Sequence, residues 1–326
     1  MISVGIIGAS GYTGEELVKI LQNHPDVKIK SLTSRTHAGK KISEVFNLET
    51  PIDEEFKSPV IENLLGCDVV FFATPNGIAM SMAKELLDNN IRIIDISADF
   101  RITNAEVWEE WYGQKHLSPS LLSKSIYGLP EIPGQRQKIR QALIVANPGC
   151  YPTSALLALL PIHSNLDKQQ IIVNSTSGIS GAGRNLDSRK LFAEGHDNFQ
   201  AYAVGAHRHY PEMLQTLNKA NANLDILFVP HLSSIARGIY STIYLRHEFE
   251  AIDEVIEDYK AFYDDSPFVQ IITEQTFPKI SETTGTNMCN ISIHKVQSGD
   301  EGVNLVILST LDNLIKGASG QAVQNM

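Results

Sequence analysis

Residues 2–14 read ISVGIIGASGYTG, an apolar run that passes directly into three glycines spaced three residues apart. The run Ile2–Ile7 predicts a buried strand, and the amphipathic stretch Glu15–Gln22 that follows the glycines predicts a helix. A strand joined to a helix by a glycine-rich turn is where a Rossmann domain holds the phosphates of a nucleotide. This stretch therefore predicts a nucleotide-binding α/β domain at the start of the chain.

The three glycines suit the three tasks of such a turn. Gly8 can take the conformation of a tight turn, Gly11 lets backbone N–H groups approach a pyrophosphate, and Gly14 lets the helix pack closely on the strand. Their spacing is G-x-x-G-x-x-G and not the usual G-x-G-x-x-G. A glycine cluster alone is more often a plain turn, so the interpretation depends on the strand before it and the helix after it.

The end of the next predicted strand, Val27–Thr33, indicates which nucleotide is bound. An NAD site usually carries Asp or Glu there to hold the ribose 2′-hydroxyl, whereas this chain has Ser34 and Arg35 and no acid. A hydroxyl and a guanidinium suit a 2′-phosphate, and Lys40 and Lys41 lie close by in the sequence. Arg35 could equally be a solvated loop charge, but with the acid missing we expect NADP(H) as the cofactor.

Farther along, the pattern of apolar runs changes near the middle of the chain. Up to Pro148 short runs alternate with helical stretches, which is typical of a parallel sheet with helices on both faces. Beyond Pro148 strand-like segments dominate, which predicts an α+β domain with a mixed and largely antiparallel sheet. Strands are expected at Asp68–Ala73, Ile91–Ile96, Ala142–Ala146, Ile171–Ser175, Ile226–Val229, Gly238–Arg246, Phe268–Thr273, Asn290–Val296 and Val303–Leu308, and helices at Ile78–Leu87, Pro211–Leu217, Ile252–Tyr263 and from Asp312.

The composition is that of an ordinary globular chain of about two domains. The 326 residues are 43% hydrophobic and 20% charged, and the longest apolar runs are far shorter than the roughly 20 residues of a transmembrane helix. The formal net charge of −10 argues against nucleic acid as a partner. With no signal-peptide pattern and three widely spaced cysteines, we expect a cytoplasmic protein without a membrane or nucleic-acid partner.

Cys150 is the candidate nucleophile among the three cysteines. It lies in NPGCYPT at 147–153, after a predicted strand, and Pro152 suits the first turn of a helix. The free N–H groups and the dipole at a helix N-terminus stabilise a thiolate, the nucleophilic form of cysteine. The alternative is a buried core cysteine, which is what we expect of Cys67 and Cys289 because both adjoin predicted strands.

A cysteine nucleophile needs an acid or a base, and the stretch AHRHYPE at 206–212 supplies two imidazoles. Three interpretations of it compete: a zinc site, a basic surface patch, and an acid–base group next to an anion site. No further Cys or His pair with metal-binding spacing is visible, so we expect no metal. An imidazole can take a thiol proton or protonate a developing oxyanion, so the third interpretation uses every residue of the stretch.

Together these motifs resemble the N-acetyl-γ-glutamyl-phosphate reductase family, which is related to aspartate-semialdehyde dehydrogenase. The resemblance covers essentially the whole chain, with its segments in the expected order, and ANPGCYPT and HRHYPE are specific to the family. Family chains commonly continue for some residues beyond the final QNM, with a further apolar stretch. The segments are GASGYTG at 8–14, SADFR at 97–101, YGLPE at 127–131, ANPGCYPT at 146–153, SGISGAG at 177–183, AHRHYPE at 206–212, HLSSIARGI at 231–239 and IKGASGQAVQNM at 315–326.

The resemblance implies a reaction. It is the NADPH-dependent reduction of the acyl phosphate N-acetylglutamyl 5-phosphate to N-acetylglutamate 5-semialdehyde and phosphate, a step of arginine biosynthesis. Cys150 would expel phosphate and hold the acyl group as a thioester, and a histidine of the HRH motif would be the acid–base group. We prefer His207 for that role, with Arg208 and His209 nearer the anionic groups of the substrate.

The other expected site residues fall into two groups. The cofactor contacts are expected from Gly8, Ser10, Gly11, Tyr12, Thr13, Gly14, Ser34, Arg35, Thr74, Pro75, Ser177, Gly178, Gly181 and Asn313. A substrate with a carboxylate and a phosphate needs local cations in an acidic chain, and the substrate contacts are expected from Arg101, Asn147, Arg184, Arg208, His209 and Glu212, with Arg237 as a further candidate. Arg184 is the most persuasive cation because it adjoins the glycine-rich loop 177–183, although that loop could instead face the cofactor phosphates.

The resemblance also implies that the segment from Asp312 packs back on the nucleotide-binding domain. We therefore expect a domain of residues 1–147 with 312–326 for NADP(H), a domain of residues 148–311 for catalysis and oligomerisation, and a homodimer or homotetramer. Two other functions compete. One is the aminoadipyl-phosphate reductase of lysine biosynthesis, whose substrate is one methylene longer, and the other is a non-catalytic NADP-binding redox sensor for which Cys150 would be dispensable.

Overall fold

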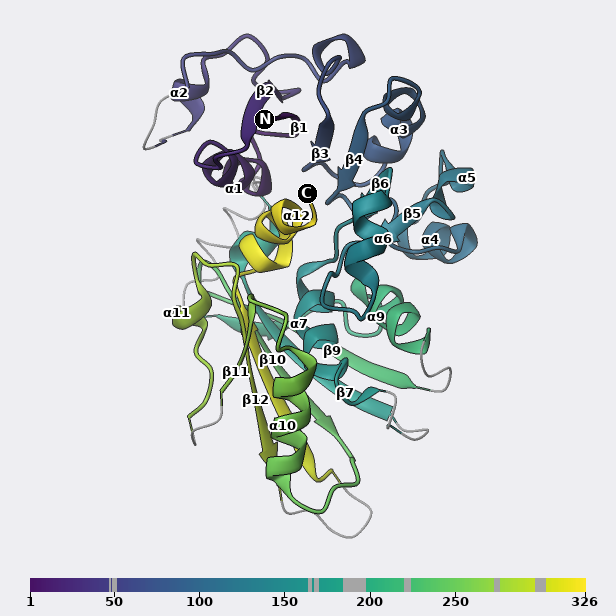
Figure 1. Cartoon of the computed structure of the whole chain (residues 1–326), viewed down its shortest axis with the longest axis vertical. Helices are drawn as coiled ribbons and strands as arrows, with labels where there is room; N and C mark the ends of the chain where they lie inside the picture. Colours follow the sequence, from purple (N-terminus) through teal and green to yellow (C-terminus); the bar gives the residue numbers. More distant parts are fainter. Residues whose placement is uncertain are drawn as a thin grey trace. The chain divides into compact units, whose positions relative to one another are not determined.

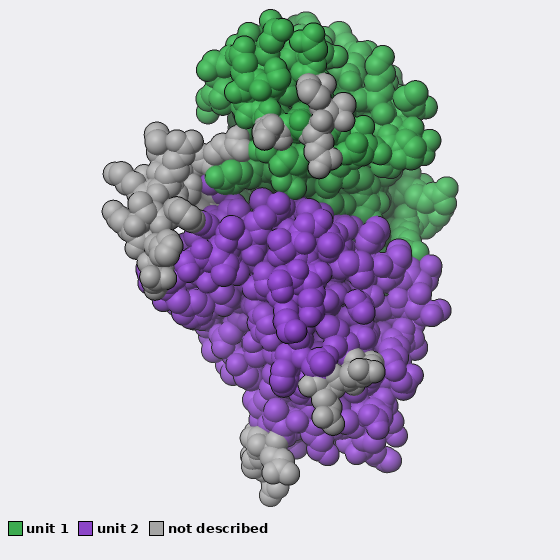
Figure 2. Space-filling model, turned by 90° about the vertical axis from the view of Figure 1, so that its left-hand side faces the viewer, with its two compact units in different colours: residues 1–148, 318–326 green, residues 149–317 purple. Residues whose placement is uncertain are grey.

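In a computed structural model the chain forms two compact units. Unit 1 comprises Met1–Pro148 and Ala318–Met326, and unit 2 comprises Gly149–Gly317 (Figure 2). Residues 312–317, which the sequence analysis grouped with the nucleotide-binding domain, thus fall in unit 2. The structure describes residues 1–46, 48, 52–163, 166, 170–183, 198–219, 224–272, 276–296 and 303–326.

Unit 1 is built on a sheet of six parallel strands in the order β2-β1-β3-β4-β6-β5 (Figure 1). The strands are β1 (Ile2–Ile7), β2 (Val27–Thr33), β3 (Val69–Phe72), β4 (Arg92–Asp95), β5 (Ser125–Tyr127) and β6 (Ile144–Ala146). Strand order reverses between β1 and β3, which is the position where a Rossmann sheet binds its nucleotide. The predicted Rossmann domain is confirmed, and β5, which is three residues long, was not predicted from the sequence.

Helices cover both faces of this sheet. Successive residues of a strand point to opposite sides, and because the strands are apolar on both sides, each face packs against helices. Val70 and Phe72 of β3 belong to one core cluster, with Trp108 of α4, and Phe71 belongs to another, with Ala322 of α12. The helices of unit 1 are α1 (Tyr12–Leu21), α2 (Ile42–Val45), α3 (Ile78–Asp88), α4 (Ala105–Tyr112), α5 (Pro119–Leu122), α6 (Gln135–Gln141) and α12 (Gly320–Asn325), and a 3-10 turn spans Ile61–Asn63.

Asp99, in the bend after β4, caps the N-terminus of α3. Its Oδ1 accepts the N–H of Gly77 at 2.8 Å and its Oδ2 accepts the N–H of Met80 at 3.0 Å, which fixes the turn between β3 and α3. Burial and the neighbouring carboxyl of Asp95 raise the pKa of Asp99 to about 7. Between about pH 4 and 7 the folded chain therefore keeps a proton that the unfolded chain releases, so this group makes the fold less stable as the pH rises.

We expect Asp99→Asn to remove this loss of folding stability with rising pH. The free energy of unfolding, measured with urea at pH 5 and pH 7.5, should fall more in the wild type than in the variant, because the other titrating groups contribute to both. Asp88→Asn, which changes an exposed carboxylate on α3, the helix that Asp99 caps, is the matched control and should behave as the wild type. An equal fall in the wild type and Asp99→Asn would contradict the assignment.

Unit 2 contains a sheet in the order β11-β12-β13-β10-β7-β9-β8. In the described strands, β11–β12 and β7–β9 pair parallel and the other neighbours pair antiparallel, so the predicted mixed and largely antiparallel sheet is confirmed. The strands are β7 (Gln170–Gly178), β8 (Phe199–Ala201), β9 (Asp225–Ser233), β10 (Ile239–Leu245), β11 (Val269–Ile271), β12 (Cys289–Lys295) and β13 (Leu305–Leu311). Of these, β8 was not predicted.

In the described part of unit 2 the helices are α7 (Cys150–Leu159), α9 (His209–Asn218), α10 (Ile252–Phe262) and α11 (Ile280–Thr283), with a 3-10 turn at Ile179–Ala182. The helix predicted from Asp312 begins later, as a π-helical turn at Ile315–Ser319 that continues into α12. Within the described parts of the chain, no helix is both long enough and apolar enough to cross a membrane.

Helix α7, which Figure 1 labels, contacts β10 and β13 of this sheet. Its residues 151–159 are all buried. Four fully buried serines join the helix to the strands. Ser154 of α7 donates to Ser241 of β10 at 2.8 Å and lies 3.0 Å from Ser309 of β13, and Ser175 of β7 lies 2.7 Å from Ser241. These hydroxyls fix the helix whose first residue is Cys150.

Candidate active site

Cys150 is the first residue of α7, as the sequence predicted. It is partly exposed, whereas Cys67 and Cys289 are buried in the core, as expected of them. Gly149 precedes it in an extended conformation and offers no side-chain cap. The N–H groups of the first helical turn therefore lie beside the cysteine, in the arrangement that favours a thiolate.

Helix α9 brings two side chains to the residue before the nucleophile. Glu212 Oε1 accepts the N–H of Gly149 at 2.8 Å, and the side chain of Glu212 is buried. The ring of His209 packs on the same glycine, where a β-carbon would lie 2.5 Å from Nε2, so no larger residue fits at position 149. Glu212 was expected to contact the substrate, but its carboxylate is bound to the backbone beside Cys150, a placement that favours a positioning role.

His207 is committed to an internal hydrogen-bond chain. Its Nδ1 accepts the N–H of His209 at 3.1 Å, and its Nε2 lies 3.3 Å from the hydroxyl of Tyr202. Burial, with the charge of Arg208, lowers the pKa of His207 to about 4, so the ring is neutral at pH 7 and Nε2 carries its proton. The Tyr202 hydroxyl donates to Tyr151 at 3.1 Å, so both ring nitrogens of His207 are occupied.

The two phenols complete this chain as proton donors. Tyr151 donates its hydroxyl hydrogen to the carbonyl oxygen of His231 at 3.1 Å. Burial raises the pKa of Tyr202 to about 12 and that of Tyr151 higher still, so both stay protonated at neutral pH. Neither tyrosine was expected as a site residue. Tyr151 directly follows Cys150, and that adjacency was the sequence signal for it.

The other two members of the HRH motif, Arg208 and His209, lie nearer the start of α9 than His207 does. His209 is partly exposed at the first position of α9 with its ring on Gly149, and Arg208 is exposed on the preceding residue. From the sequence alone, His207 was expected to be the acid–base group and His209 to lie nearer the anionic groups of the substrate. The geometry favours the opposite order, because His209 is the imidazole next to the residue that precedes the nucleophile.

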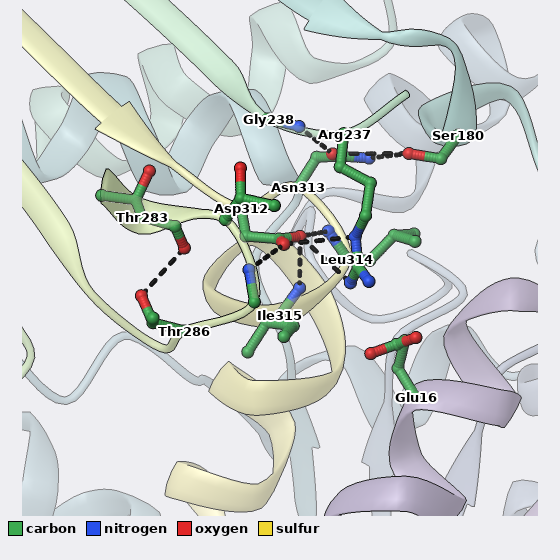
Figure 3. A network of polar contacts seen from close by, with 12 residues as sticks. Glu16, Ser180, Arg237, Gly238, Thr283, Thr286, Asp312, Asn313, Leu314 and Ile315 are labelled. Atoms are coloured by element: carbon green, nitrogen blue, oxygen red, sulfur yellow. Dashed lines mark hydrogen bonds and ion pairs between the residues drawn. The ribbon is translucent and has the colours of Figure 1, made fainter. Parts of the chain in front are cut away.

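The glycine-rich loop after β7 packs against the start of β10. A β-carbon on Gly178 would lie 2.8 Å from the N of Arg237, and one on Gly181 would lie 3.0 Å from the buried Ser177 Oγ. Asn313 ties the two segments together, since Oδ1 accepts the N–H of Gly238 at 2.7 Å and Nδ2 donates to Ser180 at 3.0 Å (Figure 3). The structure thus brings together the four expected cofactor residues of unit 2, with the amide of Asn313 engaged inside the protein.

Two of the expected substrate contacts in unit 1 are buried. Arg101 donates from Nε to the carbonyl of Asn147 at 2.7 Å and from Nη2 to the carbonyl of Ile96 at 2.8 Å. Asn147 donates to the carbonyl of Ala318 at 3.1 Å and accepts from Asn325 at 3.0 Å. These placements favour structural roles: Arg101 joins the ends of β4 and β6, and Asn147 holds the C-terminal segment.

Two further candidate cations for the substrate were Arg184 and Arg237. Arg184 lies outside the described residues. Arg237 forms an ion pair with the fully buried Asp312, with Nε 3.2 Å from Oδ2, so its charge is balanced within the protein. Among the described residues, no group of three or more His, Cys, Asp or Glu side chains is arranged to hold a metal ion.

The turn after β1 has the shape of a phosphate cradle. Gly8 has φ +81°, and a β-carbon there would lie 2.4 Å from the carbonyl oxygen of Ala73. A β-carbon on Gly14 would lie 2.5 Å from the carbonyl oxygen of Ala9, so both glycines are required by close backbone contacts. Gly11 precedes α1 without a side-chain cap, and Tyr12 and Thr13 open the helix, whose N-terminus is the kind of place where backbone N–H groups bind an anion.

The residues around this cradle also fit a dinucleotide. Ser10 and Ser34 face each other with 2.7 Å between their hydroxyl oxygens, and Arg35 is exposed beside them. His37, which the sequence analysis missed, lies with Nδ1 3.4 Å from the Ser34 hydroxyl. After β3, Pro75 is exposed, and Thr74 Oγ1 is buried with no hydrogen-bond partner among the described residues, as expected of a group that meets a ligand.

Comparisons with known proteins agree with the division of the chain into two units. The family model described as semialdehyde dehydrogenase, NAD binding domain, matches residues 3–142, and the one described as semialdehyde dehydrogenase, dimerisation domain, matches residues 150–313. The structure is similar to the crystal structures of aspartate semialdehyde dehydrogenase II from Vibrio cholerae, with a TM-score of 0.73 at 17% identity, and of aspartate semialdehyde dehydrogenase with NADP from Candida albicans, with 0.74 at 15% identity. Each comparison covers 100% of this chain and 97% of the other, and shows the shared fold.

Two curated relatives are much more similar in sequence. This chain is 46% identical over 330 residues to the N-acetyl-gamma-glutamyl-phosphate reductase of Nitrosospira multiformis, and 45% identical over 331 residues to that of Pseudomonas aeruginosa. Both alignments cover 100% of this chain and 94% of the relative. With both family models matched and this identity over its full length, the chain belongs to the N-acetyl-gamma-glutamyl-phosphate reductases within the semialdehyde dehydrogenase family.

Proposed function

We propose that this enzyme reduces N-acetylglutamyl 5-phosphate to N-acetylglutamate 5-semialdehyde and phosphate with NADPH, through a thioester on Cys150. The observation that carries the proposal is a partly exposed cysteine at the first position of α7 with the ring of His209 packed on the preceding residue. The substrate is supported by the two relatives that align over the whole chain, both of which are N-acetyl-gamma-glutamyl-phosphate reductases. A redox sensor, the competing function, has no use for a nucleophile and an imidazole placed in this way.

The first half of the reaction is acyl transfer. Cys150 gives its proton to His209, and Sγ attacks the carbonyl carbon of the acyl phosphate. A carbon–sulfur bond forms, the bond from carbon to the phosphate oxygen breaks, and phosphate leaves with the electron pair. Glu212, by holding the N–H of Gly149, keeps the turn before the nucleophile in place during this step.

The second half is reduction and release. NADPH, when bound at the cradle of unit 1, supplies the hydride that reduces the thioester carbonyl. His209 then returns its proton to the developing oxyanion, which gives a thiohemiacetal on Cys150. When His209 takes that hydroxyl proton back, the carbonyl re-forms, the carbon–sulfur bond breaks and the aldehyde leaves with Cys150 as the thiolate. His209 thus acts both as base and as acid.

Recognition of the anionic substrate is assigned to cations near the nucleophile. Arg208 is exposed and adjacent to His209, so it is the candidate on the described surface of unit 2. Arg184 stays a prediction for the same role. Homo-oligomerisation through unit 2 is part of the proposal, because the family model described as a dimerisation domain matches residues 150–313. Sedimentation equilibrium distinguishes a dimer from a tetramer.

The choice of NADPH over NADH is assigned to Arg35 with the hydroxyl of Ser34. We expect Arg35→Ala to raise the KM for NADPH by about 10–100-fold, since a hydrogen bond to a charged group is worth about 1.5–3 kcal/mol. The KM for NADH, which lacks the 2′-phosphate, should stay as in the wild type. Lys28→Ala, which removes another exposed cation from the same unit, is the control, and an equal rise for both cofactors in Arg35→Ala would contradict the assignment.

The substrate itself is tested in the reverse direction. The purified chain is given NADP, phosphate and either N-acetylglutamate semialdehyde or the semialdehyde that is one methylene longer, and NADPH formation is followed. A pocket that distinguishes one methylene gives a ratio of about 10–200 in kcat/KM. A preference for the shorter aldehyde supports the proposal, whereas a preference for the longer one would assign the chain to the aminoadipyl reaction.

A further inference from the structure

Gly317 packs directly on the nucleophile. A β-carbon on Gly317 would lie 2.6 Å from Cβ of Cys150 and 3.0 Å from its Cα, which is closer than unbonded carbon atoms pack in proteins. The obstructing atoms are the first carbons of Cys150, so they cannot swing aside as the end of a long side chain would. Any side chain at position 317 must therefore displace either Cys150 or the turn that carries Gly317.

That turn is organised by Asp312. The N–H of Gly317 donates to the carbonyl oxygen of Asp312 at 2.9 Å, a bond that spans five residues and leads into the π-helical turn Ile315–Ser319. The carboxylate of Asp312 accepts the N–H of Leu314 at 2.8 Å and that of Ile315 at 3.2 Å. The position of Asp312 therefore determines where the backbone of Gly317 lies.

Two groups outside the turn hold the carboxylate of Asp312, and Figure 3 shows one of them, Arg237. Arg237 approaches with Nε 3.2 Å from Oδ2 and Nη2 3.3 Å from Oδ1, and Gly285 donates its N–H to Oδ2 at 2.8 Å. The side chain of Asp312 has no exposure, so its charge depends on these partners. A buried charge that loses a partner is strongly destabilised, which makes this pairing sensitive to single substitutions.

We infer that Asp312 is a positioning residue for the reaction: with Arg237 it fixes a turn that sets the bare backbone of Gly317 against Cys150. The inference rests on Cys150 being the nucleophile, as proposed above. Cys150 is then held from two sides, by Gly317 and by the Gly149 turn that Glu212 anchors. A misplacement of about 1 Å at a reacting group can cost about 10²-fold in rate, so this contact governs turnover.

The experiment compares Gly317→Ala and Asp312→Asn with the wild type. The first variant inserts a methyl group against Cys150, and the second keeps the shape of the side chain but removes the charge that Arg237 balances. Gly5→Ala is the matched control, because a β-carbon there is also crowded, at 3.1 Å from side-chain atoms of Leu64 and Val70 in the core of unit 1. Three quantities are measured: kcat and KM, the melting temperature, and the rate of Cys150 alkylation by iodoacetamide against pH.

Gly317→Ala should lower kcat by about 10²-fold with the KM for NADPH unchanged, and should raise the pH midpoint of Cys150 alkylation. Asp312→Asn should change both quantities in the same direction by a smaller factor. Tyr151 and Tyr202 interact electrostatically with Cys150, and the ring of His209 packs on the neighbouring Gly149; none of these three side chains is changed in any variant. Gly5→Ala should lower the melting temperature and leave the alkylation profile as in the wild type.

A wild-type alkylation profile in Gly317→Ala or Asp312→Asn, with kcat lowered no more than in Gly5→Ala, would overturn the inference. If both buried variants fail to fold, Arg237→Lys decides, because that side chain is a quarter exposed. It keeps the charge but loses one of two contacts, so it must also raise the alkylation midpoint. The proposed function fails separately, if Cys150→Ser remains active. An inactive Cys150→Ser with a normal Gly317→Ala rejects only the positioning role.

Discussion

Replacing Cys150 by serine is expected to lower kcat by more than about 10³-fold, the scale seen when a covalent nucleophile is removed. Serine places a hydroxyl at the same first position of α7, but the N-terminus of a helix cannot deprotonate a hydroxyl near neutral pH as it can a thiol. The KM for NADP should be unchanged, since the cradle that Gly8 and Gly14 form is in the other unit. The measurement is phosphate-dependent NADP reduction with N-acetylglutamate semialdehyde.

Cys289→Ser is the matched control for this variant. Cys289 is fully buried, with Sγ 3.4 Å from the hydroxyl of Ser309, so a serine there can hydrogen-bond and should leave kcat near the wild-type value. In the wild type, iodoacetamide should label Cys150 rapidly near neutral pH and Cys67 and Cys289 slowly. Equal labelling of the three cysteines, or an active Cys150→Ser, would contradict the role of Cys150 and favour the sensor function.

His209→Asn is expected to lower kcat by about 10²–10⁴-fold, the range of a lost acid–base group, with a much smaller change in KM. Asparagine keeps a planar polar side chain over Gly149 but can neither take the thiol proton nor protonate the oxyanion. The loss should therefore appear in turnover, and a plot of kcat against pH should lose the inflection that a titrating imidazole produces. Steady-state rates from pH 5 to 9 measure both effects.

His207→Asn is the control on the same motif. Because burial keeps the pKa of His207 at about 4, its ring is neutral throughout that pH range and cannot cause the inflection. The variant breaks the hydrogen-bond chain through Tyr202, so a moderate loss of kcat is expected with the inflection retained. If the inflection disappears in His207→Asn and persists in His209→Asn, the acid–base role belongs to His207.

The architecture of unit 1 follows from its sequence because buried parallel strands are continuous apolar runs. β1 and β2 begin and end at the residues that the pattern predicted, and the end of β1 in a glycine turn located the cradle. The pattern missed β5 and β8, each of three residues and too short to show a period, and it also missed the helices α4 and α6. In unit 2, β7 extends to Gly178, beyond the predicted end at Ser175. Its last residues continue the strand by pairing with β10, but they are polar, so the apolar pattern does not include them.

The nucleophile could be predicted from local sequence, whereas the choice between two histidines could not. The turn of glycine and proline around Cys150 sets its position on α7 within a few residues. The roles of His207 and His209 depend on which neighbours the fold brings to each ring, and Tyr202 and Gly149 become neighbours only in three dimensions. Buried polar roles, such as that of Asp312, are invisible to periodicity for the same reason.

Helix α7 is apolar on every side, so its packing alone would tolerate small rotations and sliding on the sheet. Directional hydrogen bonds, which apolar contacts lack, come from the hydroxyls of Ser154, Ser175, Ser241 and Ser309. These bonds define one rotation of the helix about its axis and one position along the sheet. A selection for thermal stability alone would accept alanine at these positions and keep a well-packed core. The position of the Cys150 sulfur would then be less well defined. An enzyme stabilised in this way should therefore have a higher melting temperature and a lower turnover number.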